Sequence, residues 1–245
     1  MTQLHAVQRL FLERKAKSTR PYLARGAGID RCQACQLSKA YCQCHIRQSL
    51  NSDVAFLLIM HDAEVLKPSN SGRLIADMIP DTHAYIWNRT EPNEEMLALL
   101  ENEAYQPFLI FPHDYAVDGQ ARVSSVTLES GKKPLFVMLD GTWREAKKMY
   151  RKSPYLQQMP MLSFQLDGPI TRYTLREGVR DFQVATAEIA SLAIDAAGEP
   201  QNAKALQTWF EIYCEASFSA ATKPTKSYRL PLEQLQQEFL TQIKN

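Results

Sequence analysis

The sequence predicts an α/β fold: a parallel-rich sheet with helices on both faces, together with a small zinc-binding segment near the N-terminus. Short runs that are apolar throughout alternate with amphipathic stretches along the 245-residue chain. Strands that are buried on both faces are continuously apolar, and parallel strands need helical crossovers between them. A dense group of cysteines precedes the first apolar run and indicates a separate metal-binding segment.

The predicted elements alternate as crossover connections require. Strands are expected at 53–60, 83–87, 107–112, 133–140 and 161–166, with an irregular strand at 123–128. A turn followed by a short helix is expected at 69–80, and helices are expected at 93–102, 142–153, 184–198 and 199–218. The polar stretch 167–183 has no periodicity, and a long loop of this kind in a compact domain is often functional.

Charge and hydropathy indicate how the chain is organised. The first 50 residues carry a net charge of +7 and the remainder carries −6. This asymmetry favours an anionic partner that binds from one side, although a solvated basic helix has the same composition. No apolar run approaches the roughly 20 residues that span a bilayer, and the N-terminus lacks the apolar core of a signal peptide. We therefore expect a cytoplasmic protein without a membrane partner. Its expected parts are a basic N-terminal helix (1–27), a cysteine segment (28–50), a main domain (51–230) and a helical tail (231–245).

Four cysteines form the predicted metal site: Cys32, Cys35, Cys42 and Cys44. Their spacing, C-x2-C followed by C-x-C, can supply the four thiolates of a tetrahedral zinc ion. Two disulfides are the alternative, and a cytoplasmic location disfavours them. Four protein ligands leave no open position for water, so the zinc is expected to be structural. Cys214 stands alone in an apolar helical stretch and is expected in the core.

The stretch LDGTWREAKKMY, residues 139–150, marks a junction between a strand and a helix. Thr142 and Glu145 have the spacing of a capping box, with Gly141 at the bend and Asp140 as the last strand residue. Ligands of open parallel sheets bind beyond the carboxyl ends of the strands, which is where Asp140 is expected. From spacing alone, Asp140 either supports the turn or acts in a site. The chain contains neither a dinucleotide-binding glycine motif nor a P-loop.

The helix that follows this junction is expected to have two different faces. Its apolar face carries Trp143, Ala146 and Tyr150. The other face carries five cations: Arg144, Lys147, Lys148, Arg151 and Lys152. A phosphate backbone that passes the strand ends would need such a face, although a solvated basic face is also common.

Several motifs together resemble the signature of the DTW-domain family. They are the four cysteines, SNSGR (69–73), FPHDYA (111–116), the DGTW junction (140–143) and YTLREGVRDFQVATAEIA (173–190), in the order that the family shows. The resemblance covers roughly residues 28–200. Ala185 and Ile189 depart from the family's usual Ser and Ala, which affects only the fine contacts of the last motif.

The resemblance implies both a fold and an activity. The family is similar to the SPOUT-type methyltransferases, whose C-terminal half forms a trefoil knot and binds S-adenosylmethionine. Its bacterial members resemble tRNA-uridine aminocarboxypropyltransferases. These transfer the 3-amino-3-carboxypropyl group from S-adenosylmethionine to N3 of a uridine and release methylthioadenosine. The resemblance therefore implies tRNA and S-adenosylmethionine as partners. Because many SPOUT proteins dimerise, a homodimer is also expected.

The residue pattern and the resemblance together select candidate site residues. Asp140 is expected to be a general base or an orienting group, and Trp143 either anchors its helix or forms an aromatic wall for a ligand. The expected cofactor-binding residues are Phe111, Pro112, Leu139, Gly141, Thr142, Arg176 and Thr186. The expected RNA-binding residues are Asn70, Ser71, Arg73, Arg144, Lys147, Lys148 and Arg151.

Two other functions remain open at this point. One is a SPOUT-like RNA methyltransferase that uses the same pocket, and the other is a non-enzymatic, zinc-dependent RNA-binding protein. Three histidines, His61, His83 and His113, lie near predicted strand ends but have no metal-site spacing. We expect them to be solvated or hydrogen-bonded.

Overall fold

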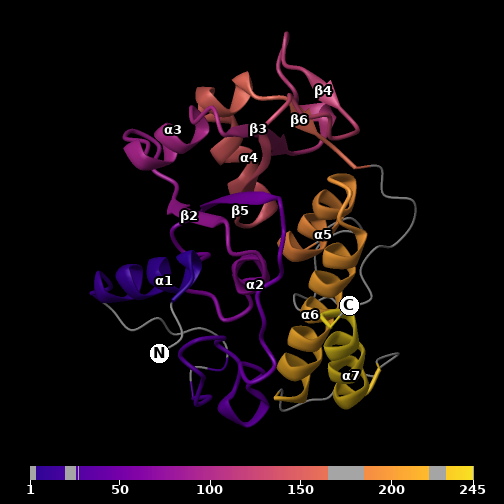
Figure 1. Cartoon of the computed structure of the whole chain (residues 1–245). Helices are drawn as coiled ribbons and strands as arrows, with labels where there is room; N and C mark the ends of the chain where they lie inside the picture. Colours follow the sequence, from indigo (N-terminus) through magenta and orange to yellow (C-terminus); the bar gives the residue numbers. More distant parts are fainter. Residues whose placement is uncertain (1–3, 20–25, 27, 165–184, 221–229, 245) are drawn as a thin grey trace.

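A parallel sheet forms the centre of the protein (Figure 1). The computed structural model describes residues 4–19, 26, 28–164, 185–220 and 230–244. The strands are β1 (Ala55–Met60), β2 (Thr82–Ile86), β3 (Tyr105–Ile110), β4 (Arg122–Val123), β5 (Lys133–Asp140) and β6 (Met161–Leu162). They lie in the order β2-β1-β5-β3-β6-β4, and every pair of neighbours is parallel. The predicted α/β class with a parallel sheet is confirmed.

Helices cover both faces of this sheet. They are α1 (Ala6–Ala16), α2 (Gly72–Met78), α3 (Glu94–Leu100), α4 (Trp143–Arg151), α5 (Thr186–Ala196), α6 (Pro200–Ser219) and α7 (Leu232–Gln242). Three short 3-10 helices are η1 (Lys39–Tyr41), η2 (His113–Tyr115) and η3 (Pro154–Gln158). In Figure 1, α3 and α4 lie on one side of the sheet, and α2, α5 and α6 lie on the other.

The side chains of β1 explain why its sequence is apolar throughout. Alternate residues of a strand point to opposite faces of a sheet. Phe56 and Leu58 belong to the core beneath α2, α5 and α6, whereas Leu57 and Ile59 belong to the core beneath α3 and α4. All six residues of β1 are buried. Burial on both faces is the physical reason that the sequence shows a continuous run rather than alternation.

Several element boundaries differ from prediction. β4 and β6 are only two residues long, shorter than the strands expected at 123–128 and 161–166. β6 pairs with the last two residues of β3 and with β4, and β4 has no other partner among the described residues, so the sheet ends in two short strands. The turn and short helix expected at 69–80 are present: the Asn70 side chain accepts a hydrogen bond from the Arg73 backbone in the turn, and α2 begins at Gly72.

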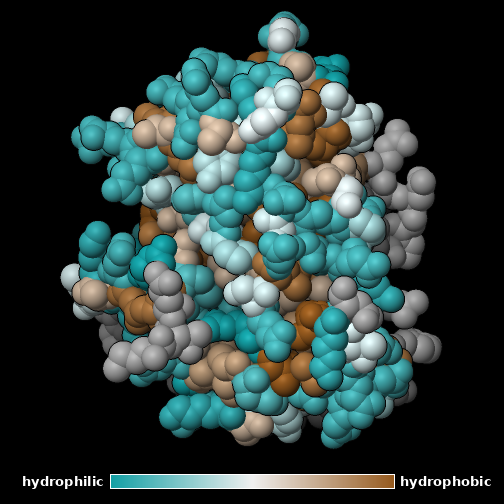
Figure 2. All heavy atoms as spheres, viewed as in Figure 1, coloured by the Kyte–Doolittle hydropathy of each residue, from teal (hydrophilic) through white to brown (hydrophobic). Residues whose placement is uncertain are grey.

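The loop expected at 167–183 falls outside the described residues, and the predicted trefoil knot stays a prediction. The four-part domain division also stays a prediction. Among the described helices, none is long and apolar enough to cross a membrane. On the face shown in Figure 2, hydrophilic residues predominate and hydrophobic ones form separate patches.

Candidate functional site

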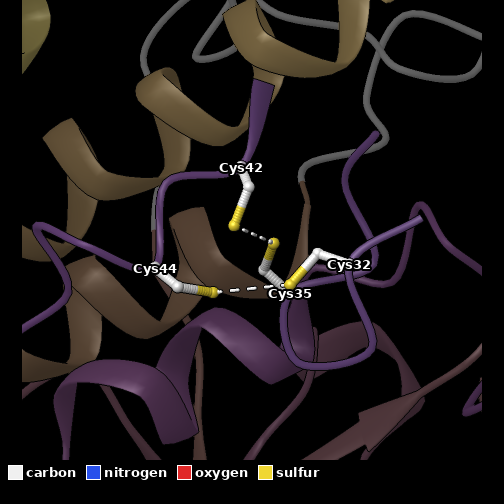
Figure 3. A group of neighbouring side chains, drawn as sticks. All are labelled: Cys32, Cys35, Cys42 and Cys44. Atoms are coloured by element: carbon white, nitrogen blue, oxygen red, sulfur yellow. Dashed lines mark hydrogen bonds between the residues drawn. The ribbon is translucent and has the colours of Figure 1, made fainter. Parts of the chain in front are cut away.

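The four predicted cysteine ligands converge on one point (Figure 3). The Sγ atoms of Cys32 and Cys44 are 3.8 Å apart, as are those of Cys35 and Cys42. All four sulfurs lie within 4.8 Å of one another. Thiolates bound tetrahedrally to zinc at about 2.3 Å lie about 3.8 Å apart, so this donor set fits the ion.

Local backbone structure builds this cluster. The Cys32 N–H donates to Leu37 O at 2.8 Å, and the Gln36 N–H donates to Cys32 O at 2.9 Å. Gln36 has a φ of 63°, a left-handed conformation that lets the chain turn back between the first two cysteines. The hydrogen bond with Cys44 lowers the pKa of Cys35 to about 5, and the pKa of Cys44 is correspondingly raised. A cation at this point would stabilise the thiolate forms of all four side chains.

A buried carboxylate fastens the cysteine segment to the main domain. Asp77 on α2 accepts hydrogen bonds from Arg47 at 2.8 Å and from the Trp209 indole at 3.2 Å. His5, the N-cap of α1, also lies 3.2 Å from this carboxylate. Burial alone would raise the pKa of Asp77, but His5 and Arg47 lower it below its ordinary value. Asp77 therefore joins α1, α2, α6 and the cysteine segment.

Asp140 lies at the carboxyl end of β5, as predicted, and is only 3 % exposed. Its Oδ2 accepts a hydrogen bond from Asn70 Nδ2 at 2.6 Å, and its Oδ1 accepts one from Thr186 Oγ1 at 2.8 Å. The site thus joins the loop before α2, the end of β5 and the first turn of α5. Three distant segments hold this carboxylate in one orientation.

Only glycine fits at position 72, next to the carboxylate of Asp140. A Cβ at position 72 would lie 2.6 Å from Asp140 Oδ2 and 3.5 Å from Asn70 Oδ1. The first distance is far below van der Waals contact, so any side chain here would displace the carboxylate. Close approach to Asp140 explains the glycine in the sequence SNSGR.

The turn after Asp140 has the predicted capping box. Thr142 N–H donates to Glu145 Oε2 at 2.7 Å, and the Glu145 N–H donates to Thr142 Oγ1 at 3.4 Å. Burial opposes ionisation of Glu145, but the hydrogen bonds from Thr142 lower its pKa. Gly141 lies in the bend, where a Cβ would be 3.2 Å from that of Glu145 and 3.3 Å from that of His61.

His61 is a residue of this site that the sequence analysis did not select. Its N–H donates to Asp140 O at 2.8 Å, so it continues the pairing of β1 with β5 beyond the strand end. Its Nδ1 lies 3.3 Å from Glu145 Oε1, within ion-pair distance but outside hydrogen-bond geometry. The available signal was its position, directly after the first strand. The other two histidines are hydrogen-bonded as expected, His83 to Asp81 and His113 to Met161 O.

An aromatic stack lies beside the DGTW turn. The ring of Phe111, just beyond β3, is 5.2 Å from that of Trp143 and 5.2 Å from that of Tyr150, with 23° between planes in both cases. Trp143 and Tyr150 are two helical turns apart on α4, about 10.5 Å, so Phe111 lies between them. Both faces of Phe111 are therefore covered, which leaves it no face for an adenine ring.

Trp143, at the end of this stack, is accessible to solvent, and so is the neighbouring Tyr115. Trp143 is 37 % exposed, and so is Tyr115, whose ring meets it edge-on at 5.5 Å and 84°. Lys147 Nζ lies 5.8 Å from the Trp143 ring centre and 6.0 Å from that of Tyr115. Tyr115 was not predicted as a site residue. Both rings can contact a ligand without rearrangement of the core.

The cations of α4 form the exposed face that the sequence predicted. Lys147 is half-buried, and the other four are exposed: Arg144, Lys148, Arg151 and Lys152. Within the described ranges, no carboxylate forms an ion pair with any of the five. The single acid of α4, Glu145, is engaged by Thr142 and faces His61. We call these five residues the α4 cationic face; within the described ranges, no ion pair offsets its charge.

Three residues that were expected to bind RNA are instead buried: Asn70, Ser71 and Arg73. The Arg73 guanidinium donates to the carbonyl oxygens of Asn70 and Lys67 at 3.3 and 3.1 Å. Asn70 holds Asp140, and its other amide atom caps Arg73. We correct the expectation for this segment: all three side chains are buried and present little surface to RNA, and those of Asn70 and Arg73 organise the strand-end site.

The remaining predicted residues have different settings. Pro112 and Leu139 are half-buried beside the strand ends, and Thr186 contacts Asp140 directly. Arg176 lies outside the described residues.

Glu188 was not predicted, but it is 2 % exposed and accepts a hydrogen bond from the Ala185 N–H at 2.8 Å at the start of α5. Burial raises the pKa of Glu188 to about 7.

Comparison with known proteins identifies the domain that carries these features. The sequence model of the DTW domain matches residues 29–217, which include the cysteine cluster, Asp140, the α4 cationic face and Thr186. No solved structure matches the chain significantly.

Proposed function

The chain belongs to the DTW-domain family, and from this premise we propose that it is a tRNA-modifying enzyme. Its proposed reaction transfers the 3-amino-3-carboxypropyl group of S-adenosylmethionine to N3 of a tRNA uridine and releases methylthioadenosine. One observation carries the proposal. The buried carboxylate of Asp140 lies at the carboxyl end of the central strand, oriented by Asn70 and Thr186 and followed directly by the α4 cationic face.

The reaction defines what the chain must do. The bond between sulfur and the aminocarboxypropyl carbon breaks, a bond from that carbon to N3 forms, and the N3 proton leaves. The sulfonium has three activated carbons, so the position of each relative to N3 decides which one reacts. The strand-end residues must therefore fix geometry rather than supply unusual reactivity.

Asp140 suits this orienting role. Both of its carboxylate oxygens already accept hydrogen bonds from the chain, so the side chain has one orientation. To accept the N3 proton, it would have to exchange one of these donors for the uridine. We therefore propose that Asp140 acts first as a positioning residue that holds the loop before α2 and the start of α5 together.

The α4 cationic face supports tRNA as the substrate. Four exposed cations and the half-buried Lys147 have no ion-pair partner among the described residues and begin one residue after the DGTW turn. Contacts between such cations and phosphates dominate the affinity for nucleic acids and make it depend on salt. We propose Arg144, Lys147, Lys148 and Arg151 as the contacts to tRNA phosphates.

Zinc is proposed as a structural component. Four cysteines whose sulfur separations suit the ion complete its shell, which leaves no position for a substrate. The metal would hold the cysteine segment, and through Arg47 and Asp77 it would hold α2, which follows the Asn70 loop. The cluster therefore supports the site without taking part in the transfer.

The finer structural expectations remain proposals. A SPOUT-like, trefoil-knotted C-terminal half that binds S-adenosylmethionine agrees with a parallel sheet covered on both faces, which many other folds share. A homodimer and a cytoplasmic location are proposed on the family resemblance and the composition.

Product analysis tests the proposed reaction. We expect that tRNA incubated with the protein and S-adenosylmethionine yields a uridine whose mass rises by one aminocarboxypropyl group, together with methylthioadenosine. S-adenosylhomocysteine and a methylated nucleoside would instead establish the methyltransferase. Binding of tRNA without either product, in zinc-loaded protein, would favour the non-enzymatic alternative.

A further inference from the structure

Two exposed aromatic rings beside the DGTW turn have no role in the core. Among the described residues, the exposed large hydrophobic side chains are Leu4, Leu12, Tyr115, Val117, Leu128 and Trp143. Tyr115 and Trp143 alone of these are in ring contact, with centroids 5.5 Å apart and planes at 84°. Exposed apolar groups that gather inside a charged surface mark a binding site.

The two rings are braced from below. Trp143 stacks on the buried ring of Phe111, and Tyr115 meets the same ring edge-on at 5.4 Å and 71°. The Tyr115 N–H donates to Pro112 O at 3.1 Å, which fixes η2 at the end of β3. A ligand that binds here would order little of the protein, so most of its contact energy would appear as affinity.

The charges around the rings indicate what kind of ligand they fit. Lys147 Nζ lies within 6.0 Å of both ring centres, and Arg144, next to Trp143 in the sequence, is exposed. An apolar or cationic ligand would gain nothing from these cations. A nucleotide combines a flat apolar base with a phosphate, and so matches both the rings and the lysine.

We propose that Tyr115 and Trp143 form a stacking platform for an unpaired RNA base, with Lys147 binding the phosphate next to that base. This proposal rests on the proposed function and narrows its substrate class. N3 of a uridine in a double helix is engaged in base pairing, so the enzyme must act on an unpaired nucleotide. Bases in single-stranded loops are recognised by stacking on aromatic side chains. We therefore expect the protein to bind its target uridine in an unpaired state.

A pair of short RNAs tests the platform. One is a single-stranded oligouridylate, and the other has the same ribose-phosphate backbone without bases. We expect the full-length, zinc-loaded protein to bind the first on the order of 10-fold more tightly, because stacking of one base on an aromatic side chain contributes about that factor. The Tyr115→Ala variant should lose this preference and bind both RNAs equally.

Three further variants separate stacking from folding and from charge. Tyr115→Phe keeps the ring and should keep the preference. Lys147→Ala should weaken binding of both RNAs, because both contain phosphates. Leu128→Ala removes an equally exposed side chain near Gln106, at the opposite end of β3, and should change neither affinity. A base preference that persists in Tyr115→Ala, or wild-type protein without a preference, would overturn the proposal.

The outcome is distinguishable from failure of the enzymatic proposal. If tRNA is modified with an unchanged KM by Tyr115→Ala, the platform is wrong while the transfer activity stands. If base-dependent binding is lost in Tyr115→Ala but no aminocarboxypropyl product forms with wild-type protein, the platform stands and the activity is wrong.

Discussion

The cysteine segment and the strand-end site are built in opposite ways. The four sulfurs come from 13 consecutive residues, and a tight local turn brings the first two together. The groups around Asp140 come from positions 70 and 46 residues away in the sequence. The cysteine site is determined by the spacing of its ligands in the sequence. The Asp140 site forms only when the whole sheet has folded.

This difference predicts different sensitivities. The cysteine segment should respond to any loss of a ligand but tolerate changes elsewhere. The strand-end site should respond to small changes of volume or hydrogen bonding wherever its three segments meet. The two regions are linked indirectly through α2, by the Arg47–Asp77 pair and by the Leu50 N–H, which donates to Met78 O.

The largest effect is expected from Cys35→Ser. Cys35 is the most buried of the four ligands, and a hydroxyl is a poor substitute for its thiolate. We expect bound zinc to fall from one per chain to none, and residues 28–50 to lose amide protection, because metal binding and folding of such segments are coupled. Metal analysis and hydrogen exchange measure both quantities.

Cys214→Ala is the matched control for this change. Cys214 is buried in α6, remote from the cluster in sequence, and is a core residue as expected. Its variant should keep one zinc per chain. Retention of zinc by Cys35→Ser would show that the cluster is not the metal site.

The second-largest effect is expected from Gly72→Ala. The added Cβ would lie 2.6 Å from Asp140 Oδ2, so the carboxylate must move. Overpacking of this kind costs about 1–3 kcal/mol of stability, and a displacement of about 1 Å in a site can reduce the rate about 100-fold. Urea unfolding and single-turnover kinetics measure the two effects.

Gly28→Ala provides the comparison. A Cβ at Gly28 meets nothing within 4 Å, so this variant should match wild type in both assays. If Gly72→Ala also matched wild type, the close packing at Asp140 would not matter for the reaction.

The smallest effect is expected at the other end of the sheet, where Asp81→Asn removes a charge remote from both sites. Asp81 accepts hydrogen bonds from Lys133 and Tyr105 and lies 3.0 Å from His83 Nε2. Burial would raise its pKa, but Lys133, His83 and Tyr105 lower it. Asp81 is partly exposed, so we expect a loss of only about 1 kcal/mol and unchanged activity.

The stability of wild type and of Asp81→Asn should depend differently on pH. A carboxyl whose folded pKa is lowered stabilises the protein above its unfolded value, near 3.9, and loses that effect as the pH falls through the folded pKa. Wild type should therefore lose more stability than Asp81→Asn below about pH 4. Glu129→Gln, which breaks the more exposed pair with Lys132, should change stability less. Equal acid sensitivity of all three proteins would show that ionised Asp81 does not stabilise the fold.

The same contrast explains how much the sequence could predict. The cysteine spacing, the capping box at Thr142 and the full length of β5 were all predicted, because each depends on neighbouring residues. The burial of Asn70 and Arg73 was not, because a polar run before a helix looks the same whether it faces solvent or a buried carboxylate.

The residues that were missed have a common cause. His61 and Tyr115 take their place from the β1-β5-β3 strand order, which sequence patterns do not reveal. Glu188 could have been found as the third residue of the T-x-E start of α5, but its burial follows from the packing of α5 against α6. Local sequence can place such a residue at a strand or helix end, but it does not show which other residues it meets there.

The most direct test of the central claim is the single-turnover rate of uridine modification by Asp140→Asn. We expect a fall of about 100-fold or more, with zinc content unchanged, because the amide cannot accept hydrogen bonds at both positions. The double variant, Asn70→Asp with Asp140→Asn, restores this hydrogen bond in the opposite direction: the amide at position 140 donates to the carboxylate at position 70. It should recover part of the rate if Asp140 positions the site. A wild-type rate in Asp140→Asn would contradict the account.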